Sequence, residues 1–246
     1  MAARLAIAIF LIVATVGWAR SAEDFDPERL RQAMLRLIAA DTAATSAFTG
    51  VATIDPKIMA VLAEVPRHRF VPEPFQAYAY NNHPLPLGYE QNIAAPFLVA
   101  LMTHLAELEA DDVVFETGTG AGYHAAVLAQ LAAEVYSVEV VEPLAHQAAR
   151  RLEEMGTANV RIKPGDGYFG WVGEGPFDAI IVKEAVDHVP TPLLNQLKPG
   201  GRMVIPLGAA LDTQYLTVIR KSEDGRVTKK RVLPVRFSPL QGGERT

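Results

Sequence analysis

Apolar positions from residue 95 onward alternate between the period of a helix and that of a strand. Helices are expected where apolar residues recur every three to four positions, and strands where short apolar runs occur. The expected helices are 95–108, 123–132, 144–155 and 192–197, and the expected strands are 112–116, 134–139, 160–163, 177–183 and 202–207. This alternation predicts an α/β fold with a doubly wound, mainly parallel sheet.

The end of the chain has a different pattern. Two strand-like segments, 213–221 and 226–237, flank Ser222-Glu223-Asp224-Gly225. Asp-Gly between two such segments is a strong hairpin signal. We therefore expect a C-terminal antiparallel hairpin on the otherwise parallel sheet.

The N-terminal part predicts helices followed by a long loop. Leu30, Met34, Leu35 and Ile38 give helical spacing over 26–40, and a second helix is expected over 55–64. The proline-bracketed segment 65–72 cannot continue that helix. Segment 74–94, rich in Pro, Asn, Tyr and Gly, predicts a long ordered loop with short strands, and such loops are often functional. The chain thus divides into an N-terminal region, 22–94, and a core, 95–246.

The first 21 residues predict a secretory signal peptide. A short basic head precedes fourteen residues without charge, Leu5 to Trp18, and cleavage is expected after Ser21 or after Ala19. This run is shorter than the roughly 20 residues of a transmembrane helix. A buried core helix would show a polar face, which this segment lacks. We expect export to the periplasm without stable membrane insertion after cleavage, and a cytoplasmic protein only if the signal is not used.

The amino-acid composition excludes several kinds of catalytic and metal site. The chain has 246 residues, 50% of them hydrophobic, and no cysteine. This excludes thiol nucleophiles, cysteine-ligated zinc and iron–sulfur clusters, and no other metal site is predicted. Loss of Arg4 and Arg20 with the signal would change the formal net charge from −5 to −7. An acidic chain is unlike nucleic-acid-binding proteins, which carry a basic face.

A glycine-rich loop joins an expected strand to an expected helix between Val113 and Tyr123. Its spacing, Gly118-x-Gly120-x-Gly122, differs from the Gly-x-Gly-x-x-Gly of dinucleotide-binding proteins. Glu116 precedes it, and an acidic group there suits a ligand that carries an ammonium group and no phosphate. A glycine turn that serves only helix–strand packing is the alternative.

Two further acidic residues follow successive strands. Glu139 ends the next strand, where a carboxylate accepts both hydroxyls of a ribose. Asp166, followed by Gly167, comes after the third strand, where a carboxylate can bind an adenine amino group. Either residue alone would be read as a helix cap or a solvated turn. Together with Glu116, at strand ends where such sheets bind ligands, they predict S-adenosylmethionine. A nicotinamide dehydrogenase is disfavoured by the loop spacing and by Glu116.

These features resemble the protein-L-isoaspartate (D-aspartate) O-methyltransferase family. The resemblance spans nearly all of the chain after the signal, and its most specific segments are 65–72, 84–88, 116–123, 165–168, 197–201 and 233–237. It implies a class I S-adenosylmethionine-dependent methyltransferase fold of Rossmann-like type. It also implies methyl transfer to isoaspartyl residues of damaged proteins, by an enzyme that we expect to be a monomer.

The resemblance assigns site residues as well. Those implied to bind the cofactor are Glu116, Gly118, Thr119, Gly120, Gly122, Tyr123, Glu139, Asp166 and Gly167. Those implied to bind the substrate are Gln91, Ile93 and Pro96, in the loop region before the core.

The chain departs from the family at the reacting centre. The family pattern Gln-Thr-Ile-Ser-x-Pro is here Gln91-Asn92-Ile93-Ala94-Ala95-Pro96, so its serine falls on Ala94 and its threonine on Asn92. These two are the candidate catalytic positions, although the methyl of Ala94 cannot orient a carboxylate. Backbone N–H groups near Ile93 and the Asn92 amide could still do so. A working enzyme, a methyltransferase with another acceptor and a non-catalytic binding module all remain open.

Other polar residues give weaker indications. Lys183-Glu184-Ala185 replaces small, uncharged residues of the family pattern. Arg67, His68 and Arg69 suit either anionic groups or a solvated basic turn, and neither His68 nor His124 has a second ligand at metal spacing.

Overall fold

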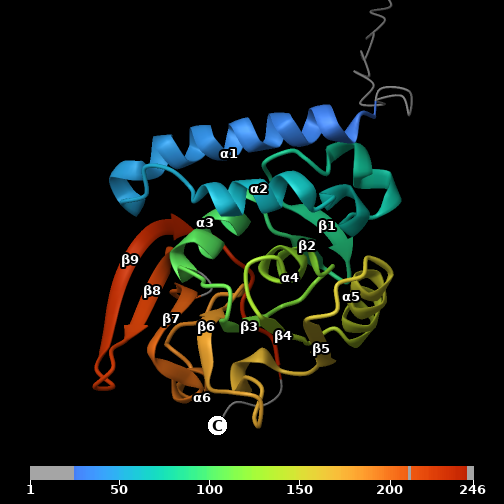
Figure 1. Ribbon diagram of the computed structural model, residues 1–246. Helices are drawn as coiled ribbons and strands as arrows, with labels where there is room; N and C mark the ends of the chain where they lie inside the picture. The colour runs from blue at the N-terminus through green and yellow to red at the C-terminus, as the bar shows by residue number, and fades with distance from the viewer. Residues whose placement is uncertain (1–24, 210–211, 243–246) are drawn as a thin grey trace, which may run out of the picture.

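The computed structural model describes residues 25–209 and 212–242. Their main element is a seven-stranded sheet in the order β5-β4-β3-β6-β7-β8-β9. Strands β3 to β7 are mutually parallel, whereas β7, β8 and β9 are antiparallel and form the edge on the left of Figure 1. The strands are β3 (Val113–Thr117), β4 (Glu134–Glu139), β5 (Val160–Pro164), β6 (Phe177–Ile181), β7 (Leu197–Leu207), β8 (Gln214–Lys221) and β9 (Val227–Val235).

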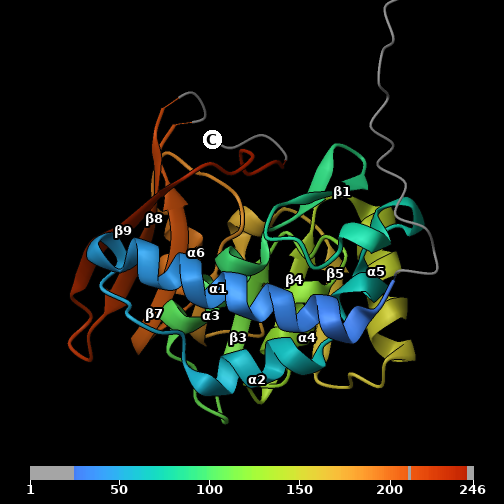
Figure 2. The same cartoon turned by 90° about the horizontal axis from the view of Figure 1, so that it is seen from above.

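Helices cover both faces of the sheet, as the doubly wound prediction requires. The helices are α1 (Pro27–Thr49), α2 (Pro56–Glu64), α3 (Pro96–Ala106), α4 (Tyr123–Leu128), α5 (Glu142–Glu154) and α6 (Thr191–Asn195), with short 3-10 turns η2 (Arg67–Phe70), η3 (Glu73–Tyr78) and η4 (Gly167–Phe169). Seen from above, α1 crosses the molecule, and it contacts α2, α3 and β9 (Figure 2).

Alternation along each strand sends side chains to two separate cores. Val114 of β3 joins the core beneath α1 to α4, and its neighbour Phe115 joins the core on the opposite face beside α6. Phe115 stacks on Phe177 of β6, with ring centroids 5.2 Å apart. Both rings are fully buried, so they fix β3 against β6.

Several elements differ in length from the sequence prediction. Helix α1 continues past residue 40 to Thr49, and Thr42 and Thr49 lie on its buried face. The hydroxyls of Thr42, Thr45 and Thr49 donate to the carbonyl of the residue four positions earlier. Asp26 caps its start, and Gly50, in the left-handed conformation, caps its end. Helix α4 ends at Leu128 rather than at residue 132. The side-chain amide of Asn159 binds the carbonyls of Ala129, Ala132 and Ala133 in the turns that follow.

Strand β7 begins five residues before its predicted start. The ladder pairs Phe177 with Leu197 and Ala179 with Arg202. Residues 198–201 therefore lie opposite Asp178 alone, and the ladder is irregular between these two pairs.

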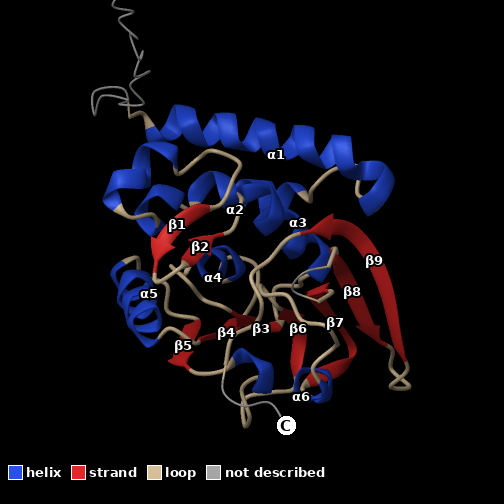
Figure 3. Cartoon of the chain, turned by 180° about the vertical axis from the view of Figure 1, so that it is seen from behind, coloured by secondary structure: helices blue, strands red, loops and turns tan. Residues whose placement is uncertain are grey.

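The long loop contains two short strands, as predicted. β1 (Leu85–Gly88) and β2 (Gln91–Ile93) form a separate antiparallel hairpin. Viewed from behind, it lies between the N-terminal helices and α5 (Figure 3). The N-terminal region therefore packs on the core and supplies the β1–β2 hairpin.

The predicted signal peptide, 1–21, lies outside the described residues. Within 25–209 and 212–242, no helix combines the length and the apolar character needed to span a membrane.

The Phe115–Phe177 stack gives a test of the core. We expect Phe115→Ala to lower the free energy of unfolding by about 3–5 kcal/mol, because it leaves a cavity between two central strands. The matched control is Phe48→Ala on α1, whose side chain is 68% exposed. Urea unfolding measures both, and a Phe115→Ala variant as stable as the control would contradict the role of this stack.

Candidate functional site

A pocket of about 210 Å³ opens at the carboxyl ends of the parallel strands. It lies where the strand order reverses between β3 and β6, the usual ligand position in sheets of this kind. Its walls come from the β1–β2 hairpin, the glycine loop after β3, the ends of β4 and β6, and residues 236–241. This pocket is the candidate active site.

Most of the predicted site residues line this pocket. They are Gln91, Asn92, Ile93, Ala94, Gly118, Thr119, Gly120, Tyr123, Glu139 and Gly167. The structure thus brings together residues up to 76 positions apart, from Gln91 to Gly167.

Four predicted residues lie outside the lining. Pro96 is the buried first residue of α3, and Gly122 precedes the first turn of α4. Asp166 accepts a hydrogen bond from the backbone N–H of Tyr168, in the manner of a helix cap. Glu116 is fully buried behind the glycine loop.

The glycine loop passes close to an acidic side chain. Gly118 and Gly120 have φ values of 62° and 56°, a region that favours glycine. A Cβ atom on Gly118 would lie 1.8 Å from Oε1 of Glu184. The turn therefore favours glycine at position 118, and the carboxylate of Glu184 fills the space where a Cβ would lie.

Glu139 connects the glycine loop to α5. Its Oε2 accepts from the N–H of Gly120 at 2.7 Å, and its Oε1 accepts from the N–H of Val141 at 2.9 Å. The side chain is 3% exposed and lines the pocket. It makes the cap-like contacts considered from sequence, and it also lies in the predicted ligand site.

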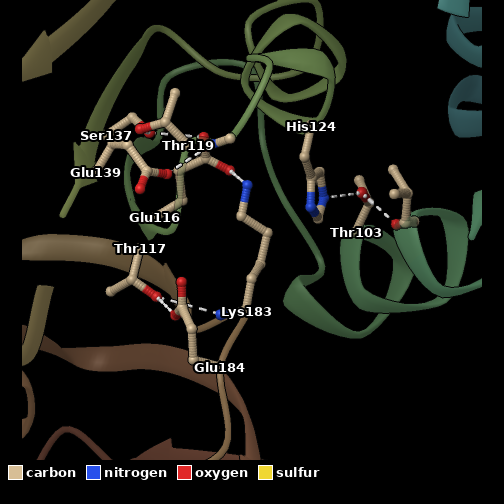
Figure 4. A network of polar contacts seen from close by, with 11 residues as sticks. Thr103, Glu116, Thr117, Thr119, His124, Ser137, Glu139, Lys183 and Glu184 are labelled. Carbon is tan, nitrogen blue, oxygen red and sulfur yellow. Dashed lines mark hydrogen bonds and ion pairs between the residues drawn. The ribbon is translucent and has the colours of Figure 1, made fainter. Parts of the chain in front are cut away.

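Glu116 forms a buried ion pair within the protein. Its Oε2 lies 2.8 Å from Nζ of Lys183, while its Oε1 accepts from the hydroxyl of Ser137 at 2.7 Å. Ser137 in turn contacts the hydroxyl of Thr119 on the glycine loop. Figure 4 shows Lys183 extending from the loop after β6 to Glu116, with His124 on its other side. The ammonium partner that Glu116 suggested is thus present in the chain itself.

Glu184, next to Lys183, has a raised pKa. Burial raises the pKa of Glu184 from 4.5 to about 7. The hydroxyl of Thr117 donates to Oε2 of Glu184, and this bond together with Lys183 counteracts part of the rise. Glu139 and Glu116 raise the pKa further, because a third negative charge near them is unfavourable.

His124 is neutral, and its tautomer follows from its neighbours. The hydroxyl of Thr103 donates to the carbonyl of Val99 at 2.8 Å, so its oxygen accepts from Nε2 of His124 at 2.9 Å. The lone pair of His124 therefore lies on Nδ1. Burial, reinforced by the charge of Lys183, lowers the pKa of His124 well below its usual value.

Arg67 holds the backbone of the substrate-side segment. Its Nε donates to the carbonyl of Ala79 at 2.7 Å, and its Nη2 donates to the carbonyl of Ala94 at 2.8 Å. The side chain is fully buried, with its guanidinium over the ring of Tyr123. Burial lowers the pKa of Arg67 to about 10. The alternative of a solvated basic turn is wrong for this residue.

Sequence reasoning missed three parts of the site. The sequence pattern shows Lys183 as a departure from the family but gives no role to Lys183 or to Ser137. Residues 236–241 reach the pocket because the N–H of Ala185 donates to Ser238, and the N–H of Leu240 donates to Ala185. The family-like segment 233–237 was the only signal that pointed toward this tail.

The family model for protein-L-isoaspartate(D-aspartate) O-methyltransferase matches residues 48–245. The chain is 47% identical to protein-L-isoaspartate O-methyltransferase 2 of Syntrophobacter fumaroxidans, over 96% of either chain. The chain belongs to this family. Protein-L-isoaspartate O-methyltransferase 1 of Cupriavidus necator is 53% identical over 86% of this chain and 82% of its own. A solved structure named protein-L-isoaspartate O-methyltransferase gives a TM-score of 0.75 at 28% identity, covering 86% of this chain and 66% of the other.

Membership of the protein-L-isoaspartate O-methyltransferase family confirms the resemblance drawn from sequence. The structural match also confirms the predicted class I fold. Within this family, the individual roles of Ala94, Asn92 and the glycine-loop residues stay predictions.

The raised pKa of Glu184 predicts a pH-dependent stability. The folded protein keeps the Glu184 proton up to about pH 7, whereas the unfolded chain releases it near 4.5. The folded state therefore binds more protons in this interval, and the free energy of unfolding falls as pH rises through it. Glu184→Gln should remove a loss on the order of 3 kcal/mol between pH 4.5 and pH 8.

Urea unfolding of both proteins at pH 4.5 and pH 8 measures this difference. Glutamine keeps a carbonyl oxygen for the Thr117 hydroxyl, so the hydrogen bond is preserved. An equal pH dependence in wild type and Glu184→Gln would show that Glu184 titrates normally.

Proposed function

We propose that this protein is an S-adenosylmethionine-dependent carboxyl methyltransferase that acts on L-isoaspartyl and D-aspartyl residues of damaged proteins. The observation that carries the proposal is one pocket that joins the glycine loop and Glu139 to the hairpin segment Gln91–Ala94. Family membership over residues 48–245 supports the same activity.

The residues around Glu139 suit the ribose of the cofactor. Each oxygen of the Glu139 carboxylate accepts one backbone N–H, and each has a second lone pair available for a ribose hydroxyl. Val138 and Val140 add apolar surface beside it. When bound, S-adenosylmethionine supplies a methyl group on a sulfonium; a carboxylate oxygen of the acceptor bonds to this methyl as the carbon–sulfur bond breaks, leaving its electron pair on sulfur.

This reaction requires little acid–base catalysis from the protein. A carboxylate with a pKa of roughly 4 is already ionised at neutral pH, so no general base is required. The contribution of the pocket is to hold the acceptor in line with the methyl group and to exclude water, and orientation alone can remove about 7–11 kcal/mol of a barrier. Arg67 fixes the backbone of Ala94 for this purpose, and Asn92 offers a side-chain amide.

The proposal also covers the cellular location and the oligomeric state of the protein. Residues 1–21 have the composition of an export signal, so we propose that the mature protein acts in the periplasm, as a monomer. Its acidic character is unsuited to nucleic acid. Fractionation of cells expressing a C-terminally tagged chain should place a shortened protein in the periplasm, and full-length protein in the cytoplasm would refute export.

Isoaspartyl turnover is the central test. Incubation with radiolabelled S-adenosylmethionine should give a base-labile methyl ester on an isoaspartyl peptide and none on the same peptide with normal aspartate. We expect Ala94→Ser to change the rate by less than about tenfold, which corresponds to 1.4 kcal/mol of barrier.

Each other outcome identifies an alternative. No ester from wild type but ester from Ala94→Ser would indicate a binding module that has lost turnover. Cofactor binding by calorimetry with no isoaspartyl ester from either protein would refute isoaspartyl methylation and leave another acceptor or a binding module as the alternatives.

A further inference from the structure

Lys183 is the buried positive charge of the pocket. Among the described residues lining it, lysine and arginine occur at Lys183 and Arg236, and Arg236 lies exposed on the C-terminal segment. The side chain of Lys183 is 11% exposed. His124 also lines the pocket, but it is neutral, and its Nδ1 is buried and carries a lone pair, so it offers an anion no charge. An anion entering the pocket therefore meets one buried cation.

An acceptor carboxylate needs such a cation here. Glu139 and Glu184 line the pocket, and Glu116 lies directly behind it. Like charges brought together away from water repel, so the Glu139 carboxylate opposes the entry of another carboxylate, and Glu184 adds to this repulsion when it is ionised. The family serine, which could offer a hydroxyl, is replaced by Ala94.

The ammonium group of Lys183 has N–H donors that its contact with Glu116 does not use. It carries three N–H groups, and among the described residues its one ion-pair partner is Glu116. The loop holding it is fixed on two sides, because the N–H of Lys183 donates to the hydroxyl of Thr117 and the neighbouring Ala185 pairs with the C-terminal segment. The main chain at Lys183 is thus held in place, and its long side chain extends the charge away from it.

We propose that Lys183 binds the acceptor carboxylate, in place of the hydroxyl that is missing at position 94. Glu116 keeps the ammonium in the pocket, and the remaining N–H donors of Lys183 orient the carboxylate toward the methyl group. The inference rests on the proposed function, because it names the group that recognises the isoaspartyl carboxylate.

Peptide binding separates this role from a purely structural one. The ligands are a fluorescent isoaspartyl peptide and the same peptide with its isoaspartyl carboxylate converted to a carboxamide, each titrated in the presence of S-adenosylhomocysteine. Wild type should prefer the carboxylate by about 10- to 100-fold, the range for a hydrogen bond to a charged group. Lys183→Met should lose this preference, and Lys183→Arg should retain most of it.

Two controls keep the outcome interpretable. Lys229→Met removes an exposed lysine on β9 and should behave as wild type. Lys183→Met leaves Glu116 unpaired, so the change is also made together with Glu116→Gln and compared with Glu116→Gln alone. Thermal unfolding and calorimetry with S-adenosylhomocysteine identify the variants that are folded and bind the cofactor product, and the carboxylate preference is compared among these.

The turnover data distinguish the possible failures. We expect the Lys183→Met change to raise the KM for the isoaspartyl peptide by about 10- to 100-fold. If wild type methylates the peptide and a folded Lys183→Met protein keeps both its KM and its carboxylate preference, the role of Lys183 is overturned while the proposed function stands. If wild type neither binds nor methylates the isoaspartyl peptide, the proposed function fails, and this inference fails with it.

Discussion

The ion pair between Glu116 and Lys183 joins the two strands on either side of the point where the sheet reverses its order. Parallel strands end at one edge of a sheet, so the acidic residues near the ends of β3 and β4 and in the loop after β6 meet in one place. Three carboxylates, those of Glu116, Glu139 and Glu184, would repel one another there. The Lys183 ammonium and the raised pKa of Glu184 both reduce this negative charge. They allow the loop after β6 to lie directly against the glycine loop.

Much of the fold followed from the sequence, because strand and helix periods are local signals. The runs that predicted β3, β4 and β6 are short, apolar and bounded by glycine or charged residues, so their positions were found to within two residues. Glu139 was identifiable as a site residue for a related reason. A carboxylate at the carboxyl end of a buried strand lies at the ligand-binding edge of a parallel sheet, and this position follows from the strand alone.

Contacts between distant segments could not be predicted in this way. Lys183 and Glu116 are 67 residues apart, and Arg67 reaches Ala94 across 27 residues, so neither pair has a spacing that signals contact. The length of α1 was missed because threonines are weak helix formers by propensity. Thr42 and Thr49 are buried where α1 packs on the rest of the protein, and this packing is absent from the local sequence signal. In each case a side chain found a partner that only the folded chain supplies.

The bond from Arg67 to the carbonyl of Ala94 also bears on how the family can diversify. The main chain at this position is fixed by a buried guanidinium, and its course does not depend on the side chain that residue 94 carries. Serine and alanine can therefore be exchanged there without moving the wall of the pocket. The chemistry at the reacting centre and the shape of the site are thus set by different residues, and each is free to change while the other is kept.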